Sequence, residues 1–516
     1  MKSEPPELGE LLCASFERFH DLPALWLSGK LISYARLFAA AAEAADAIMA
    51  TTEPGERVGI LAQSSFPAYV GILASILSGR PYVPINMKFP FERQLSIASI
   101  SGCSLLIADD YSRKRCGELL ERLGDQVREA QIVDSGDDEP QSLPDFRSHR
   151  FVGKFALAYI IFTSGTTGTP KGVAVRRDNV ASYLHAIKRY VPIEPGTRCT
   201  HLFDLSFDPS VHDLLHTWVN GGCLYVMDRE DTLDPVGFAR RHALQSWCSV
   251  PSVVAMAGRM RRLSAGILPH MQFSMFCGEA LPVSLAEEWA KVAPNSRIIN
   301  SYGPTETTIV ITAGEYVPGK TDPEYPATVP LGTIFEDCAA VIVDESGNPA
   351  TVGELWLGGA LIADGYINNA EETAKKFVKK TFPGYRYDRW YRSGDLVRSD
   401  SRYGFVFQGR IDDQVKIQGY RIELLEIEEV LRRVCGSSEA AATPWPMTDA
   451  GSAEGIVAFV NATAKTEREI IAGCRSLLPS YMTPRQIIFV ENLPLNANGK
   501  VDRNALRRQL SLGKKN

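Results

Sequence analysis

The chain has 516 residues, of which 45% are hydrophobic, and these values predict a globular protein of several domain-sized units. A net charge of -6, from 55 basic and 61 acidic residues, gives no electrostatic case for binding nucleic acid or an anionic membrane. The N-terminus lacks an apolar signal core, and the longest uncharged apolar stretch, Ser64 to Gly79, is too short to span a bilayer. We therefore expect a cytoplasmic protein without membrane insertion. Ten cysteines without a Cys-x-x-Cys pair predict reduced core thiols.

The first part of the chain alternates amphipathic helical patterns with short apolar runs, which is typical of a mainly parallel α/β sheet. Ser33 is a suitable N-cap for the Ala-rich helix predicted from Tyr34 to Ala50. A polar segment, 134–150, predicts a loop. The strands predicted on either side of it are 57–62, 104–108 and 155–162.

A second α/β alternation follows this loop. Asp178 is the predicted N-cap of a helix that runs to residue 190, and Asp234, which precedes a proline, caps another. Ser284 and Glu287 have capping-box spacing for a third helix. The other predicted elements are helices 235–244, 252–262 and 285–293 and strands 223–227, 246–250, 272–276 and 297–300. Two stacked α/β lobes fit this order better than one.

From about residue 339 the pattern becomes rich in strands, including 353–359 and 405–408, and predicts a β-rich subdomain that packs on the lobes. Past Arg410 the order helix, strand, helix, strand predicts a small α+β unit. Its elements are 423–433, 455–460, 467–478 and 486–490.

A run of Gly, Thr, Ser, Pro and Lys follows the strand 155–162. A phosphate-binding loop needs hydroxyl groups, glycines whose backbone N–H groups can approach the ligand closely, and a positive charge. This run supplies all three, and Lys171 carries the charge. The run is not the Walker pattern, because Gly172 follows Lys171 where that motif needs Ser or Thr. By composition alone a solvated surface loop is an equal alternative. The residues that it offers to phosphate are Thr163, Ser164, Gly165, Thr166, Thr167 and Lys171.

The segment from Tyr159 to Val173 resembles the phosphate-binding signature of the adenylate-forming enzymes. This superfamily includes acyl-CoA synthetases, luciferases and the amino-acid-activating domains of nonribosomal peptide synthetases. Further motifs follow in the superfamily's order, so the resemblance covers residues 155–503. It implies an α/β fold with a large N-terminal domain, 1–411, made of two α/β lobes and the β-rich subdomain, and a small mobile α+β domain, 412–516. It also implies ATP and Mg²⁺ as cofactors.

Three segments resemble the nucleotide-binding motifs of this superfamily, although each could by itself be a turn. In 300–308 the resemblance implies that Tyr302 packs on adenine, that Thr305 bonds the α-phosphate and that Glu306 holds Mg²⁺. An aromatic face, a hydroxyl and a hard carboxylate suit these tasks. Asp395 would accept from the ribose hydroxyls, and Arg410 would touch the ribose. The remaining nucleotide contacts implied are Gly278, Glu279, Ala280, Asn300, Ser301 and Gly303.

Two residues, Lys500 and Asp412, gain a role only from the resemblance. Lys500 follows an Asn-Gly turn and would otherwise be a solvated lysine. It matches the catalytic lysine that bridges the acid's carboxylate and the ATP α-phosphate, where a positive charge offsets the repulsion between two anions. The segment 409–423, otherwise a charged surface hairpin, resembles the joint between the domains and places the hinge at Asp412.

The segment 203–215 matches the region where amino-acid-activating members carry an aspartate for the substrate's ammonium, and this places it at Asp208. A buried carboxylate opposite an ammonium is a paired charge, whereas a fatty or aryl acid would leave it unpaired. The alternative is an N-cap for the following helix. The implied pocket walls are Pro209, His212, Cys248, Met275, Cys277, Ser301, Ile309 and Val310.

The segment 276–281 and the overall length look most like stand-alone D-alanine:carrier-protein ligases, in which a cysteine near the α-carbon favours the D form. Pro209 and His212 stand where that pattern has apolar residues. A substrate amino acid with a polar or differently shaped side chain therefore stays an alternative. The resemblance implies that a small, D-alanine-like amino acid is adenylated. The aminoacyl group then passes to the phosphopantetheine of a carrier protein, which we expect in trans because no carrier domain follows Arg503.

Three other functions stay open on the sequence. An acyl-CoA synthetase would apply the same machinery to a non-amino carboxylic acid and CoA, although Asp208 argues against it. A nucleotide sensor without catalysis is the second, although Lys500, Glu306 and Asp395 are all present. The third is a zinc hydrolase, because His212 and the histidine four residues later have helical i,i+4 spacing, but the acid of His-Glu-x-x-His is missing.

Overall fold

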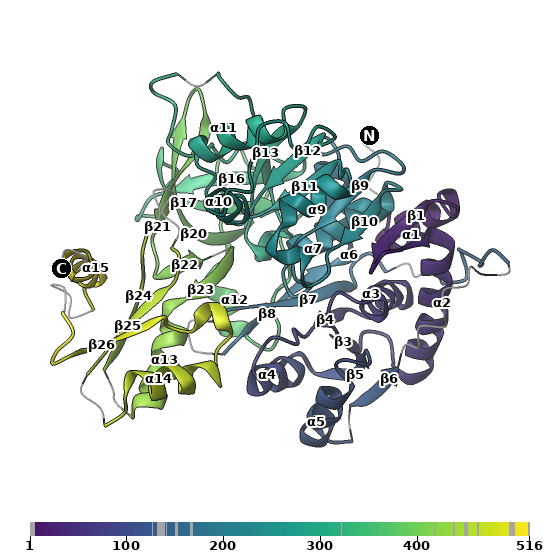
Figure 1. Ribbon diagram of the computed structural model, residues 1–516, viewed down its shortest axis with the longest axis horizontal. Helices are drawn as coiled ribbons and strands as arrows, with labels where there is room; N and C mark the ends of the chain where they lie inside the picture. The colour runs from purple at the N-terminus through teal and green to yellow at the C-terminus, as the bar shows by residue number, and fades with distance from the viewer. Residues whose placement is uncertain are drawn as a thin grey trace.

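The computed structural model describes residues 6–125, 127–131, 140, 142–149, 153–165, 169–320, 322–417, 419–436, 439–447, 453–461, 464–494 and 501–513. Figure 1 shows two large α/β sheets, a smaller β-rich sheet and a C-terminal unit. This mixed α/β architecture confirms the predicted fold class. Within the described ranges no helix is both long and apolar enough to cross a membrane.

The first large sheet has seven strands in the order β18-β8-β7-β4-β3-β5-β6. Its centre is parallel, and β8 and β18 are antiparallel additions at one edge. The strands are β3 (Arg57–Leu61), β4 (Tyr82–Pro84), β5 (Cys103–Ala108), β6 (Arg128–Gln131), β7 (Leu157–Thr163), β8 (Lys171–Arg176) and β18 (Gly365–Tyr366). The helices of this region are α2 (Tyr34–Thr51), α3 (Phe66–Ser78), α4 (Phe91–Ser101) and α5 (Arg113–Leu123).

The second large sheet has nine strands in the order β15-β14-β13-β12-β11-β9-β10-β1-β2. They are β1 (Pro23–Leu27), β2 (Lys30–Ser33), β9 (Arg198–His201), β10 (Cys223–Val226), β11 (Ser246–Ser249), β12 (Phe273–Phe276), β13 (Arg297–Tyr302), β14 (Thr312–Tyr316) and β15 (Thr333–Ile334). The helices are α1 (Leu8–Arg18), α6 (Arg177–Ile187), α7 (Pro209–Val211), the π-helix η1 (His212–His216), α8 (Thr217–Val219), the 3₁₀ turn η2 (Asp231–Leu233), α9 (Pro235–Arg241), α10 (Pro251–Arg259), α11 (Val283–Val292) and the 3₁₀ turn η3 (Thr305–Thr307).

The lobes exchange segments that are distant in sequence. The hairpin β1-β2 precedes every strand of the first sheet but joins the second, where Leu25 pairs with Leu224 of β10. In return, β18 adds to the first sheet beside β8. One hydrophobic core runs continuously under both sheets and includes Tyr159, Trp218 and Tyr391.

The strand-rich subdomain and the C-terminal unit follow in chain order. The subdomain contains β16 (Cys338–Val343), β17 (Val352–Gly359), α12 (Ala370–Lys376), β19 (Phe377–Lys379), β20 (Arg389–Asp400) and β21 (Gly404–Arg410). The C-terminal unit, yellow-green to yellow in Figure 1, lies beside the lobes. It contains β22 (Gln414–Ile417), β23 (Tyr420–Glu423), α13 (Leu424–Cys435), β24 (Ala440–Pro444), β25 (Ile456–Asn461), α14 (Glu467–Arg475), the 3₁₀ turn η4 (Ser480–Met482), β26 (Gln486–Val490) and α15 (Arg503–Gly513).

Side-chain caps mark the start of some helices, and two predicted caps are wrong. Ser33 caps α2 by accepting from a backbone N–H, as predicted. Helix α6 instead starts one residue before Asp178, because the Asn179 side chain accepts from the backbone of the N-cap residue. The carboxylate of Glu287 does not form the predicted capping box, because it accepts from the Tyr316 hydroxyl and from a backbone N–H. All ten cysteines are free thiols, as predicted.

Candidate active site

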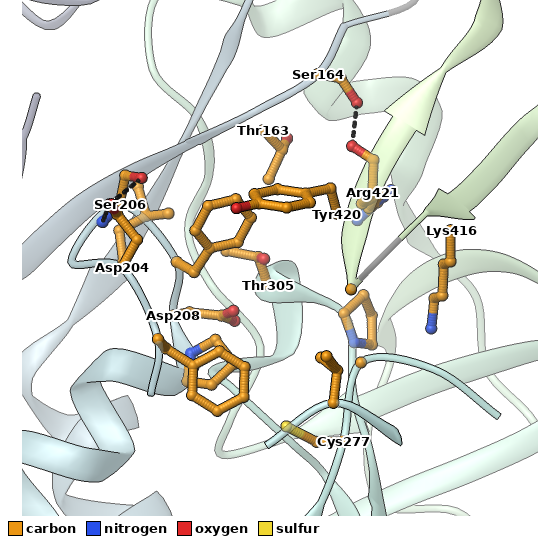
Figure 2. Close-up of a pocket in the computed structure, with 18 of the residues that line it drawn as sticks. Thr163, Ser164, Asp204, Ser206, Asp208, Cys277, Thr305, Lys416, Tyr420 and Arg421 are labelled. Atoms are coloured by element: carbon orange, nitrogen blue, oxygen red, sulfur yellow. Dashed lines mark hydrogen bonds between the residues drawn. The ribbon is translucent and has the colours of Figure 1, made fainter. Parts of the chain in front are cut away.

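A cavity of about 240 Å³ opens at the carboxyl ends of four parallel strands of the second sheet, β9, β11, β12 and β13, and at the end of β7 of the first sheet. Open α/β sheets place ligands at this edge. The β22-β23 hairpin of the C-terminal unit lines the other side. In Figure 2, Asp208, Thr305 and Cys277 surround the same space as Lys416 and Tyr420. The predicted site residues that line it are Thr163, Ser164, Asp208, Pro209, Cys277, Gly278, Tyr302, Gly303, Thr305, Ile309, Asp395 and Arg410.

A second cavity, of about 650 Å³, adjoins the first at Gly278, Tyr302 and Arg410. The predicted residues found only here are Glu279, Ala280, Asn300, Ser301 and Asp412. Between the cavities the Tyr302 hydroxyl donates to Asp395 at 2.6 Å, and Arg410 donates to the other oxygen of the same carboxylate at 2.6 Å. The predicted ribose and adenine contacts are therefore in one cluster.

Asp208 lines the first cavity and is only 8% exposed. Burial raises its pKa to about 7, and a hydrogen bond from Thr305 opposes this rise. Its Oδ2 has no hydrogen-bond partner among the described residues. Although α7 begins just after Asp208, the carboxylate makes no capping bond there. A buried carboxylate oxygen without a partner is costly unless a donor arrives, and this oxygen is free to accept from a donor that enters the cavity.

Several predicted pocket walls lie behind the cavity surface. The His212 ring is neutral, because burial lowers its pKa well below the usual value, and its Nδ1 is 2.7 Å from the Tyr183 hydroxyl. Its ring stacks on His216, whose Nε2 is 2.7 Å from the Val191 carbonyl. These contacts engage a nitrogen of each ring of the i,i+4 pair. The walls that are buried but do not line either cavity are His212, Cys248, Met275 and Val310.

Glu306 follows Thr305 in η3 and is fully buried. Its Oε1 accepts from the Tyr366 hydroxyl and its Oε2 from Arg421, each at 2.6 Å. Burial by itself would raise its pKa, but the Arg421 charge and the Tyr366 hydrogen bond lower it to about 2. Glu306 is therefore ionised. Hard carboxylate and hydroxyl oxygens are the donors that Mg²⁺ prefers, so Glu306 and Thr305 fit this ion if Arg421 withdraws.

The predicted phosphate loop contacts the C-terminal unit. Ser164 donates to the Arg421 carbonyl at 2.8 Å, which Figure 2 marks, and the Gly165 N–H donates to Glu426 at 3.1 Å. Lys171 pairs with Glu372 of α12 at 2.8 Å. Three predicted site residues, Thr166, Thr167 and Lys500, lie outside the described part of the chain.

Sequence reasoning missed the side chains that the C-terminal unit adds. Tyr420 packs edge-on against Phe207 and stacks on Tyr481, with ring centroids 3.7 Å apart in the stack. Arg421 and Glu426 reach the buried phosphate side, as described above. The signal for Arg421 was present in the joint segment 409–423, but its partner in the N-terminal part is remote in sequence. Helix α13 gave no signal for Glu426, because an acidic residue in a charged helix predicts a solvated face.

Comparison with known proteins identifies this arrangement. Residues 13–367 match the family described as AMP-binding enzyme, and residues 426–500 match the AMP-binding enzyme C-terminal domain. The chain belongs to the AMP-binding enzyme family.

Curated relatives of this AMP-binding enzyme include amino-acid-activating ligases. It is 31% identical over 493 residues to a D-alanine--D-alanyl carrier protein ligase of Bacillus velezensis, covering 92% of this chain and 93% of the relative. It is 32% identical over 483 residues to malpinin synthetase of Mortierella alpina, covering 88% of this chain. The chain spans only 6% of the length of that synthetase.

Solved structures of similar fold include adenylation domains. The adenylation domain AlmE of Vibrio cholerae, in complex with glycyl-adenosine-5'-phosphate, has a TM-score of 0.88 and 32% identity, with 98% of each chain covered. Holo-PA1221, which contains adenylation and PCP domains, has a TM-score of 0.82 and 25% identity, covering 98% of this chain and 84% of that one. This AMP-binding enzyme is therefore an AMP-forming acid–thiol ligase, and the family's use of ATP and the adenylation of an amino acid both apply to it.

Proposed function

We propose that the enzyme adenylates a small amino acid, D-alanine-like in size, and transfers the aminoacyl group to the phosphopantetheine thiol of a separate carrier protein. The unpartnered Oδ2 of Asp208 carries this proposal, because it is a buried acceptor at the end of the cavity, with no partner in the described chain. An α-ammonium group would supply the missing donor and charge. The D-alanine--D-alanyl carrier protein ligases among its relatives support the carrier protein as acceptor.

The size of the cavity limits the side chain of the substrate. The space beside Asp208 is bounded by Pro209, Cys277 and Ile309, and the whole cavity of about 240 Å³ must also hold the reacting phosphate and thiol. The deeper residue His212 is closed off by its bond to Tyr183. We therefore expect glycine and alanine to be better substrates than amino acids with long side chains.

In the first half-reaction the amino acid's carboxylate attacks the α-phosphorus of ATP and releases pyrophosphate. Asp208 holds the ammonium, and the neighbouring Thr305 hydroxyl bonds the α-phosphate, so the carboxylate is fixed between them. Lys500 offsets the charge of the two approaching anions and stabilises the transition state. Mg²⁺, when held by Glu306, neutralises the phosphate oxygens.

In the second half-reaction the thiol displaces AMP from the aminoacyl-AMP. We assign the hinge to Asp412, which lies between β21 and β22, and assign the boundary 411/412 to the mobile joint. Lys416 and Gly419 of the C-terminal unit line the cavity. This supports the assignment of the observed orientation of the C-terminal unit to the second half-reaction. Gly419 approaches Val250 so closely that a Cβ would lie 2.5 Å from Val250 Cγ1.

The test is a screen of glycine, both alanine enantiomers, serine and propionate in ATP–pyrophosphate exchange. We expect a small amino acid to support exchange and propionate, which lacks the ammonium, to fail. Phosphopantetheinylated carrier protein and CoA are then compared as acceptors, and we expect transfer to the carrier. Exchange with propionate equal to that with alanine would contradict the role of Asp208, and preference for CoA would make the enzyme an acyl-CoA synthetase.

A further inference from the structure

A cluster of three metal-ligating side chains lies behind the first cavity. It consists of His212, Asp213 and Cys248, which each offer one ligand atom, and these atoms lie within 4.8 Å of one another. The three residues are 4%, 3% and 3% exposed, and none of them lines either of the cavities described above. They therefore enclose a buried point at which one cation could contact an imidazole, a carboxylate and a thiol together.

Two elements of the second lobe hold the cluster. His212 and Asp213 are the first residues of the π-helix η1, and Cys248 lies in β11. An α-helix turns consecutive side chains about 100° apart, and the wider π turn reduces this angle, so that neighbouring residues can face the same point. Single π turns of this kind are rare and are frequent at functional sites. The local backbone thus brings two adjacent ligands to one strand.

Two of the three ligands have an outer contact that fixes their orientation. Nδ1 of His201 lies 3.2 Å from Oδ2 of Asp213, and both side chains are 1% exposed. The Tyr183 hydroxyl lies 2.7 Å from Nδ1 of His212. Metal sites in proteins have such outer contacts as a rule, and losing one typically lowers metal affinity by about 10- to 100-fold. The surroundings of the cluster therefore match those of a metal site.

The donor set selects the class of cation. Zn²⁺ accepts nitrogen, sulfur and carboxylate oxygen, whereas Mg²⁺ and Ca²⁺ prefer oxygen alone. One carboxylate, one thiolate and a neutral imidazole balance a charge of +2, so the buried complex carries no net charge. Neighbouring ligand atoms around tetrahedral Zn²⁺ lie roughly 3.3–3.7 Å apart, so binding draws the three side chains together from their spacing of up to 4.8 Å.

We propose that His212, Asp213 and Cys248 bind one thiophilic divalent cation of the zinc class behind the amino-acid pocket. On binding, the Cys248 thiol loses its proton to solvent, and the fourth position of the ion takes water. The way in passes Cys277, which lines the first cavity and whose thiol interacts with that of Cys248. The ion joins η1 to β11 and takes no part in the two half-reactions.

The test measures metal binding by the full-length enzyme, which is freed of metal with EDTA, kept reduced and titrated with Zn²⁺ by isothermal calorimetry. We expect one ion per chain in wild type. Cys248→Ser should weaken this binding by more than about 100-fold, because it removes a ligand rather than an outer contact. His201→Ala, which removes the outer contact of Asp213, should weaken it by about 10-fold.

Co²⁺ provides a second measurement, because a thiolate ligand gives it a charge-transfer absorption band. We expect this band in wild type and not in Cys248→Ser. The matched control is Cys199→Ser, which removes another buried thiol of the same sheet, in β9, and should keep both the affinity and the band.

Two results would overturn the proposal. One is a wild-type enzyme that binds no stoichiometric Zn²⁺. The other is a Cys248→Ser variant that binds Zn²⁺ as tightly as wild type, since the ion would then lie at other cysteines. If Cys248→Ser does not fold, the same comparison with His212→Gln decides. Adenylation activity enters neither measurement, so failure of the proposed function would leave this result unchanged.

Discussion

Two buried carboxylates lie on either side of Thr305, and only one of them is satisfied by the described part of the protein. Glu306 has a partner on each oxygen and a pKa lowered to about 2, although burial opposes this shift. Asp208 is buried as well, but one oxygen has no partner in the described chain, and burial raises its pKa to about 7. The comparison teaches that Glu306 finds its compensating charge within the protein, whereas Asp208 finds none, which agrees with the proposed role of Asp208 as the acceptor for the substrate's ammonium.

The largest expected effect is that of removing Lys500, whose charge we place between the amino acid's carboxylate and the α-phosphate of ATP. We expect Lys500→Ala to slow amino-acid-dependent pyrophosphate exchange by about 10²–10³-fold, because one preorganised charge is lost from the transition state. Transfer to the carrier from preformed aminoacyl-AMP should be unchanged. The control is Lys320→Ala at an exposed lysine. Exchange at the wild-type rate in the Lys500 variant would show that the two ends need no bridging charge.

Asp208→Asn tests the unsatisfied end directly. We expect the efficiency of exchange to fall by about 10²-fold, mainly through the KM for the amino acid, because a desolvated charge pair is lost. Asp204→Asn is the matched control, since Asp204 lines the same cavity but bonds Ser206. If Asp208→Asn and Asp204→Asn lose the same amount of activity, Asp208 has no special role in binding the amino acid.

Gly419→Ala separates the two half-reactions. Gly419 has φ of +82°, and the added Cβ would crowd Val250. We expect carrier transfer to slow by about 10-fold with little change in exchange, because strain of about 1–3 kcal/mol disfavours this pose alone. Gly436→Ala is the control, because its φ is also positive, at +66°, with no atom within 4 Å of the added Cβ in the described structure. An equal loss in both half-reactions would contradict a separate thiol pose.

The smallest effect is on stability without substrate. The folded pKa of Asp208, about 7, exceeds the ordinary aspartate value of 3.8. Its stabilising contribution is therefore fully present below about pH 3.8 and is lost progressively as pH rises from there to 7. We expect Asp208→Asn, which stays neutral, to gain about 2–3 kcal/mol more unfolding free energy over wild type at pH 9 than at pH 5. Thermal unfolding at both pH values measures this, and a gain independent of pH would exclude the buried charge as its cause.

Local patterns predicted the elements of this fold well, because strand and helix signals depend on neighbouring residues. The strand 486–490 is β26, and the predicted strand 57–62 differs from β3 by one residue. The transfer of β1 and β2 to the second sheet was not predictable, since it depends on pairing with β10. The cap predicted at Ser284 and Glu287 failed for the same reason, because Glu287 found a partner outside its helix.

The candidate site likewise contains residues that sequence motifs could predict and residues that they could not. Thr163 and Tyr302 are the last residues of β7 and β13, and Asp208 follows β9, so all three line the same cavity, a placement that motif order could predict. Arg421 and Glu426 could not be assigned, since their contacts exist only once the C-terminal unit lies against the lobes. The buried position of His212 behind Tyr183 likewise depends on tertiary packing.

The hairpin β1-β2 also constrains how the chain is made. Leu25 needs Leu224 as its neighbour in the sheet, and a ribosome adds roughly 5–20 residues per second. The emerging hairpin therefore keeps one edge unpaired for roughly 10–40 s before β10 is synthesised. During that interval the nascent polypeptide depends on chaperones or on its own charged flanks to avoid association with other chains.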